Sequence, residues 1–202
     1  MTPPINNTPT AIISDAHGDL PRLQAVLADI DRRGISRIIS LGDNVDDWRG
    51  GAPVLTELLR RGVPSVLGNC DLMCDLPEGS PEDQFLRSMP RELREGDVLF
   101  THISPVAGAR GVRDLRDAAQ LFRGTRQRLC FVGHIHIPAI FASDGDEALV
   151  VPFEYGEPVT LDAARRYAIC VGAVGRGRDG IDEPRYALWN PGAETVEIVR
   201  VR

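Results

Sequence analysis

Residue types that bind metals recur in five short segments of the sequence, and all four histidines of the chain are among them. The segments read SDAH, LGDN, LGNC, THIS and GHIH, and they contain Asp15, His17, Asp43, Asn69, His102, His134 and His136. Carboxylate, amide oxygen and imidazole form a donor set suited to Mn²⁺, Fe, Zn²⁺ or Ni²⁺. Residues i and i+2 of an extended segment point to the same side, so His134 and His136 are predicted to face one spot.

Each of these segments follows a short apolar run that we predict to be a β-strand. The runs are residues 10–14, 37–41, 64–67, 98–101 and 129–132. Amphipathic helices are predicted after the first two runs, one between Pro21 and Gly34 and one between Pro53 and Gly62. Such alternation predicts a parallel sheet with covering helices, and open α/β sheets bind ligands at the carboxyl ends of their strands.

Simpler interpretations exist for single residues of this kind. An aspartate after a strand more often caps a helix than binds a metal, and we interpret Asp19, Asp46 and Asp47 in that way. A lone histidine is more often a hydrogen-bonded polar residue. Seven positions at five strand ends would each need such a separate explanation, so the pattern favours a metal site.

The last third of the chain predicts a second, β-rich region. Residues 139–151 are typical of a hairpin with Asp144 and Gly145 at its turn, and residues 166–174, 185–189 and 195–201 are predicted strands. Residues 161–166 could form one helical turn. We therefore expect two sheets packed in one domain over residues 10–202, after a flexible arm rich in Pro, Asn and Thr at residues 1–9.

Composition excludes several classes of function. The net charge is −6 with no dominant basic stripe, so an extended nucleic-acid surface is not expected. All 23 basic residues are arginine, which excludes a Schiff-base lysine and a phosphate-loop lysine. No apolar run is long enough to cross a membrane, and the first residues do not form a signal peptide. We expect a cytoplasmic protein whose cysteines are reduced.

Three further patterns receive modest interpretations. GRGRDG at residues 175–180 matches a dinucleotide-binding pattern, but no helix is predicted after it, so we interpret it as a glycine-rich turn in which Arg176 or Arg178 could touch a substrate. Cys70 and Cys74 lack the second cysteine pair of a structural zinc site. The six arginines of residues 110–128 favour a solvated helical face over a lid that attracts anions.

The order D-x-H, G-D, G-N, H, G-H-x-H between Asp15 and His136 resembles the calcineurin-like metallophosphoesterase family, and most of all its small bacterial phosphodiesterases. The resemblance implies an α/β fold, a four-layer α/β/β/α sandwich of two mixed sheets. It also implies two divalent transition-metal ions, of Mn, Fe, Zn or Ni. The first would be held by Asp15, His17, Asp43 and His136, and the second by Asp43, Asn69, His102 and His134, with Asp43 as the bridge.

The reaction that this resemblance implies is hydrolysis of a phosphate ester, such as a nucleotide, by in-line attack of a hydroxide that bridges the metals. The implied catalytic residues are Cys70, Asp71 and His102. Many members have histidine where this chain has Cys70, a thiol that is protonated at neutral pH and carries no positive charge. That difference favours a phosphodiesterase. A phosphomonoesterase acting on nucleotides or phosphoproteins, and a non-catalytic protein-binding scaffold, remain alternatives, and Cys70 could simply be small enough to fit.

Overall fold

The structure is a computed structural model, and it describes residues 7–46, 51–145 and 147–202. Most of the arm predicted at residues 1–9, and the predicted helix cap Asp47, lie outside the described residues. The first strand begins at Thr10, where the sequence places it. In the described part of the chain, no helix combines the length and the apolar character needed to cross a bilayer.

One sheet has five strands in the order β2-β1-β10-β11-β8. Their bounds are β1 Thr10–Ile13, β2 Arg37–Ser40, β8 Pro158–Thr160, β10 Arg185–Asn190 and β11 Thr195–Arg200. Strands β1 and β2 are parallel, whereas β10 runs antiparallel to β1, and β11 and β8 continue the antiparallel pairing. The sheet is therefore mixed, and its two parallel strands both end at the edge that carries Asp15 and Asp43.

The other sheet has six strands in the order β3-β4-β5-β9-β6-β7. Their bounds are β3 Glu92–Glu95, β4 Val98–Thr101, β5 Leu129–Val132, β6 Ala139–Asp144, β7 Glu147–Val150 and β9 Tyr167–Cys170. Strands β4, β5 and β9 are mutually parallel, and the remaining pairs are antiparallel. Strands β4 and β5 thus end on the same side, where His102 and His134 follow them.

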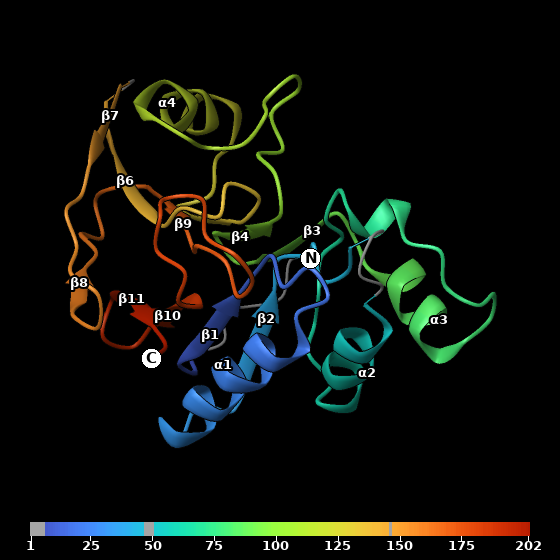
Figure 1. The fold of residues 1–202 in the computed structure, drawn as a ribbon. Coiled ribbons are helices and arrows are strands. Elements are labelled where there is room, and N and C mark those ends of the chain that lie inside the picture. Colours follow the sequence, from blue (N-terminus) through green and yellow to red (C-terminus); the bar gives the residue numbers. More distant parts are fainter. Residues whose placement is uncertain (1–6, 47–50, 146) are drawn as a thin grey trace.

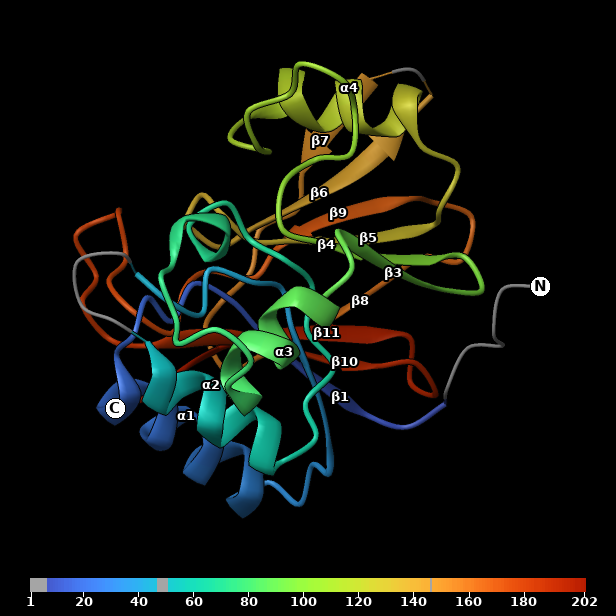
Figure 2. The ribbon, with the colours of Figure 1, turned by 90° about the vertical axis from the view of Figure 1, so that its right-hand side faces the viewer.

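The two sheets pack face to face around the central hydrophobic core (Figures 1 and 2). The inward side chain Ile12 of the first sheet packs there with Phe100 and Phe131 of the second. The rings of Phe100 and Phe131 stack with centroids 5.4 Å apart, and Trp189 of β10 lies against both. Strands buried on both faces explain why the sequence shows continuous apolar runs rather than alternation.

Helices cover the outer faces of both sheets. Helices α1 (Leu20–Arg32) and α2 (Ala52–Arg60) bury their apolar stripes on the first sheet, and α4 (Leu115–Gly124) packs on the second. Figure 2 shows α4 on one side of the molecule and α1 and α2 on the other. Helix α3 (Pro81–Ser88) packs beside α2. The predicted four-layer α/β/β/α sandwich of two mixed sheets is confirmed.

Other details differ from the sequence-based prediction. Residues 64–67 form no strand; only one bridge, between Ser40 and Ser65, joins them to β2. The pairing stops there because the segment turns towards Asn69. Residues 161–166 contain a turn rather than a helix. Strands β3 and β8 and helix α3 were not predicted, since they are short and largely polar.

The hairpin of β6 and β7 is confirmed, as is Asp19, whose side chain caps α1.

Candidate metal centre

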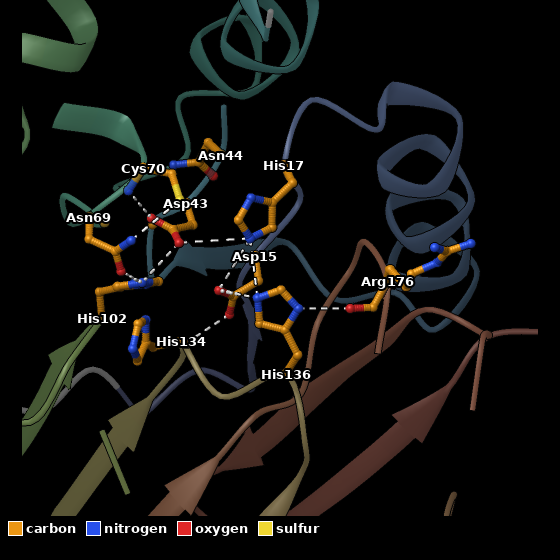
Figure 3. A network of polar contacts seen from close by, with 12 residues as sticks. Asp15, His17, Asp43, Asn44, Asn69, Cys70, His102, His134, His136 and Arg176 are labelled. Carbon is orange, nitrogen blue, oxygen red and sulfur yellow. Dashed lines mark hydrogen bonds and ion pairs between the residues drawn. The ribbon is translucent and has the colours of Figure 1, made fainter. Parts of the chain in front are cut away.

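The seven predicted ligands converge at one edge of the sandwich, between the two sheets (Figure 3). Asp15 and His17 follow β1, Asp43 follows β2, and Asn69 follows the extended segment 64–67. His102 follows β4, and His134 and His136 follow β5. Loops of the first sheet thus face loops of the second across the site.

Asp15, His17 and His136 form one half of the site. The Nε2 atoms of His17 and His136 lie 3.1 Å apart, and they lie 3.8 Å and 3.2 Å from Oδ1 of Asp15. Asp15 is fully buried, and its Oδ1 has no hydrogen-bond partner among the described residues. A buried carboxylate oxygen of this kind is costly unless a cation neutralises it, so the donors fit a divalent metal.

Asp43, Asn69, His102 and His134 form the other half. His102 Nε2 lies 3.2 Å from Oδ1 of Asn69 and 3.2 Å from Oδ2 of Asp43. The amide nitrogen of Asn69 donates to the Cys70 sulfur, which turns the Asn69 oxygen towards the site. The rings of His102 and His134 meet edge to face, with centroids 5.3 Å apart. Asp43, His102 and His134 could hold one ion together.

Asp43 lies between the two halves. Its Oδ1 accepts a hydrogen bond from the backbone N–H of Cys70 at 2.8 Å. Its Oδ2 faces both halves, 3.2 Å from His102 Nε2 and 3.7 Å from His17 Nε2. One carboxylate oxygen thus lies within 4 Å of imidazoles from both halves, where it could bind a cation together with either.

Two imidazoles are held with Nε2 towards the site. His136 Nδ1 is 2.7 Å from the carbonyl oxygen of Arg176, and His102 Nδ1 is 2.8 Å from that of Leu41. A carbonyl oxygen can only accept, so Nδ1 donates in both residues and carries the proton of the neutral ring. In the neutral rings, the Nε2 lone pairs therefore face the site and could bind a cation.

The carboxylates of the site strongly favour nearby positive charge. Burial raises the pKa of Asp15, but its contacts with His136 and His17 outweigh burial and hold that pKa far below its usual range. Burial lowers the pKa of His102, yet the hydrogen bond with Asp43 and the charge of Asp15 raise it to about 9. Burial and the neighbouring His102 lower the pKa of His134. Without metal, protonated imidazole supplies the charge that a cation would otherwise provide.

The backbone at the site is strained. The non-glycine residues with positive φ in the described chain are Glu194 and five of the predicted ligands, Asp15, His17, Asp43, His134 and His136. Their φ values lie between 47° and 71°. This left-handed conformation is unfavourable for residues with a Cβ atom, and such strain concentrates at functional sites.

Two glycines allow the loops to approach. A Cβ atom on Gly68 would lie 2.1 Å from the backbone nitrogen of Asp43 and 2.2 Å from its Oδ1. A Cβ atom on Gly133 would lie 2.1 Å from the Ser14 hydroxyl and 3.0 Å from Oδ2 of Asp15. The glycines that precede Asn69 and His134 were visible in the sequence motifs, but their steric role requires the partner loop to be known.

The catalytic role of Asp71 stays a prediction, and the structure shows a positioning role for its carboxylate. Asp71 begins the short 3₁₀ helix η1 (Asp71–Met73), and its buried side chain lies among backbone amides. Its carboxylate oxygens accept backbone N–H groups from Asp43, Asn44, Val45 and Gly68 at distances of 2.8–3.2 Å. Asp71 holds the Asp43 loop in place and has no oxygen left to pair with residue 70.

Cys70 does lie at the site. Its sulfur, a nitrogen of His17 and an oxygen of Asp43 all lie within 4.8 Å of one another. Burial, together with the charge of Asp43, raises the pKa of the thiol to about 12. Cys70 is thus a neutral thiol next to the predicted ligands, whereas Cys74 belongs to none of the described clusters of metal-binding types.

Arg185 stabilises the loop that carries His136, and the sequence analysis did not identify it. This β10 residue is fully buried and ion-paired with Asp179. Its Nη2 donates to the backbone carbonyl of His136 at 3.2 Å. A Cβ atom on Gly177 would lie 1.8 Å from the same Nη2, so the glycine-rich segment folds closely over the guanidinium. The segment RYALW was predicted only as a strand, and no local sequence pattern indicated that its arginine would be buried.

The remaining patterns behave as interpreted. GRGRDG is followed by β10 rather than a helix, and Arg176 and Arg178 line a cavity of about 260 Å³ beside His17 and His136. In α4, Arg116 and Arg123 are exposed while Ala118, Leu121 and Phe122 are buried on the second sheet. These positions agree with a solvated helical face.

Comparisons of the sequence with known proteins identify a family. Residues 9–174 match the family model described as the calcineurin-like phosphoesterase superfamily domain, and the chain belongs to that family. It is 30% identical to the uncharacterized protein MJ0912 of Methanocaldococcus jannaschii, across 95% of this chain and 86% of that protein.

Solved structures agree as well. A metallophosphoesterase from Sphaerobacter thermophilus superposes with a TM-score of 0.80 at 32% identity, covering 98% of this chain and 89% of that one. The hypothetical protein PH1004 of Pyrococcus horikoshii OT3 has a TM-score of 0.66 at 15% identity, with 96% and 88% covered, and shows the fold alone. The protein is therefore a metallophosphoesterase-type hydrolase with residues that can bind divalent metal.

Proposed function

We propose that this protein is a phosphodiesterase that depends on two divalent transition-metal ions and acts on a phosphate ester such as a nucleotide. The observation that carries the dinuclear proposal is Asp43 Oδ2, which lies within reach of imidazoles from both halves of the site. Asp15, His17, Asp43 and His136 would hold the first ion, and Asp43, Asn69, His102 and His134 the second.

Divalent cations at such a site supply Lewis-acid charge for the phosphoryl oxygens and lower the pKa of a water molecule towards about 7. The chain's own residues fix this chemistry in place. Asp71 and Gly68 position Asp43, and the Arg176 and Leu41 carbonyls orient His136 and His102. Because these groups are held in advance, little reorganisation is needed during the reaction.

Cys70 supports a diester rather than a monoester substrate. Its neutral thiol can donate a proton but brings no positive charge to the phosphoryl group. A monoester dianion gains more from an added cation than a diester monoanion does. A non-catalytic scaffold is the weaker alternative, since every predicted ligand is present and all seven converge (Figure 3). We also propose a cytoplasmic location, which agrees with four free cysteines.

The direct test is hydrolysis of a chromogenic aryl diester beside the matching monoester, with Mn²⁺ and with chelator. We expect turnover of the diester to exceed that of the monoester and to vanish with chelator. Faster monoester hydrolysis would favour the phosphomonoesterase, and no turnover with any of Mn²⁺, Fe²⁺, Zn²⁺ or Ni²⁺ would favour the scaffold.

A further inference from the structure

A cavity of about 480 Å³ opens beside Asn69 and His102. Figure 3 shows these two residues together on one side of the site, with His136 and Arg176 on the other. The cavity lies between the segment 67–72, the loop 101–105 after β4, and residues 91–92 at the start of β3. Its volume falls in the range of small-molecule sites. It is therefore large enough for an organic group attached to a phosphate held at the metal centre.

One wall of this cavity is apolar. Leu72 of η1 is 57% exposed, and Leu67, Ile103 and Pro105 line the same space. Such a large, exposed aliphatic side chain lies beside a polar site. Covering it with an apolar surface lowers the free energy of the system. The wall is therefore suited to the face of an aromatic or other flat apolar group.

The cavity also offers one positively charged side chain, Arg91. Arg91 is exposed, and it has no hydrogen-bond or ion-pair partner among the described residues. The other charged group of the lining outside the metal site is Glu92, which Arg94 holds with hydrogen bonds of 2.8 Å and 3.1 Å. Arg94 thus neutralises Glu92, and the guanidinium of Arg91 remains free to bind an anion.

We propose that this cavity binds one ester arm of the substrate, and that it selects an arm with a flat apolar surface and its own negative charge. Leu72 would contact the apolar surface and Arg91 the charge. A nucleotide unit that carries a further phosphate has this chemistry. The proposal rests on the proposed phosphodiesterase function and adds the class of substrate to it.

Two aryl diesters test the charge selectivity. 4-Nitrophenyl 4-carboxyphenyl phosphate carries an anionic arm, and the methyl ester of its carboxylate replaces that charge by a neutral group with one more methyl. We expect Arg91→Gln to raise KM for the carboxylate roughly two- to fivefold, the range of an exposed ion pair, and to leave KM for the methyl ester unchanged. Arg126→Gln is the matched control, because Arg126 is also exposed but precedes β5 at the end of the strand away from the site.

Leu72→Ser tests the apolar wall. It should raise KM for both diesters, whereas Leu115→Ser should change neither, because Leu115 is 43% exposed at the start of α4 and does not line the cavity. An unchanged KM ratio in Arg91→Gln, with diester turnover intact, would overturn the subsite and leave the proposed function standing.

Calorimetric titration separates the two proposals if no diester is hydrolysed. The probes are 4-carboxyphenyl phosphate and phenyl phosphate, bound to Mn²⁺-loaded and to metal-free protein. A preference for the carboxylate probe that Arg91→Gln removes would support the subsite even if the activity proves to be different. Equal binding of both probes to the parent protein would overturn it.

Discussion

Asp43 and Asp71 are both buried, and hydrogen bonds join their loops, yet their carboxylates have opposite surroundings. Asp71 accepts four backbone N–H groups and touches no imidazole. Asp43 accepts one backbone N–H through Oδ1 and turns Oδ2 to His17 and His102. Two aspartates in similar motifs, G-D and G-N-C-D, therefore have different roles.

The difference lies in how each negative charge is satisfied. Backbone amides provide Asp71 with fixed donors inside the protein, so this carboxylate stabilises a loop. Asp43 and Asp15 keep oxygens that only protonated imidazole or a bound cation can neutralise. Substitutions at each position should therefore separate loss of chemistry from loss of stability.

The largest effect is expected from Asp43→Asn. Replacing the proposed bridging carboxylate by an amide should lower kcat/KM for an aryl diester by roughly 10³-fold, because the charge that faces both halves of the site is lost. The metal-free variant should stay folded with a modestly lower Tm, since the amide oxygen can still accept the Cys70 N–H but the ion pair with His102 is lost. Steady-state kinetics with excess Mn²⁺ and differential scanning calorimetry provide the measurements. Activity within tenfold of the parent would refute the bridging role.

Gly68→Ala should affect activity through position alone. The added Cβ atom would overlap the backbone nitrogen and Oδ1 of Asp43, so the Asp43 loop must shift. A shift of about 1 Å in a catalytic group can cost about 10²-fold in rate. The control is Gly62→Ala, where the glycine has positive φ, unlike Gly68, and where no atom lies within 4 Å of the added Cβ. If both variants lose activity equally, contact of the added Cβ with Asp43 is not the cause.

Asp71→Asn should act mainly on stability. The amide NH₂ would face backbone donors, and leaving them unpaired should lower the free energy of unfolding by about 1–3 kcal/mol. The folded fraction should keep kcat within about tenfold, because the Asp71 carboxylate bonds backbone amides and no imidazole. Urea denaturation and kinetics at low temperature measure the two effects. Full stability combined with lost turnover would instead restore a chemical role to Asp71.

The smallest effect is expected from Cys70→Ala. With a pKa of about 12 the thiol stays protonated from pH 6 to pH 10, so its removal should move no limb of the pH–rate profile. kcat/KM for activated aryl diesters should change by less than about threefold, because their leaving groups need little proton transfer. Cys70→His should add an ionisation near neutral pH and help poor leaving groups most. A limb that moves in Cys70→Ala would show that the thiol ionises in the working range.

Much of the fold and of the site could be predicted from the sequence. The apolar runs of β1, β2, β4 and β5 are buried on both faces, which makes them unmistakable, and each is followed directly by its metal-binding residue types. The convergence of Asp15 with His136 follows from topology, because parallel strands end at the same edge.

What could not be predicted depends on partners that are distant in sequence. Asp71 differs from Asp43 through backbone amides of a loop 26–28 residues earlier. Arg185 lies in the first sheet and contacts His136, which follows a strand of the second. Arg91 has no partner among the described residues, because its neighbour Glu92 is already paired with Arg94. The segment 64–67 is apolar like a strand but makes only one bridge to β2, between Ser40 and Ser65.

The contact between Arg185 and His136 bears on how the protein can be divided into fragments. All predicted ligands precede residue 174, where the family match also ends, so a piece cut there would carry a complete ligand set. It would lack β10, which pairs with β1 beside Asp15 and whose Arg185 holds the His136 carbonyl. The predicted metal-binding side chains come from the part before residue 174, and the strand and arginine that hold two of their loops come from the part after it. We therefore expect neither fragment alone to be active.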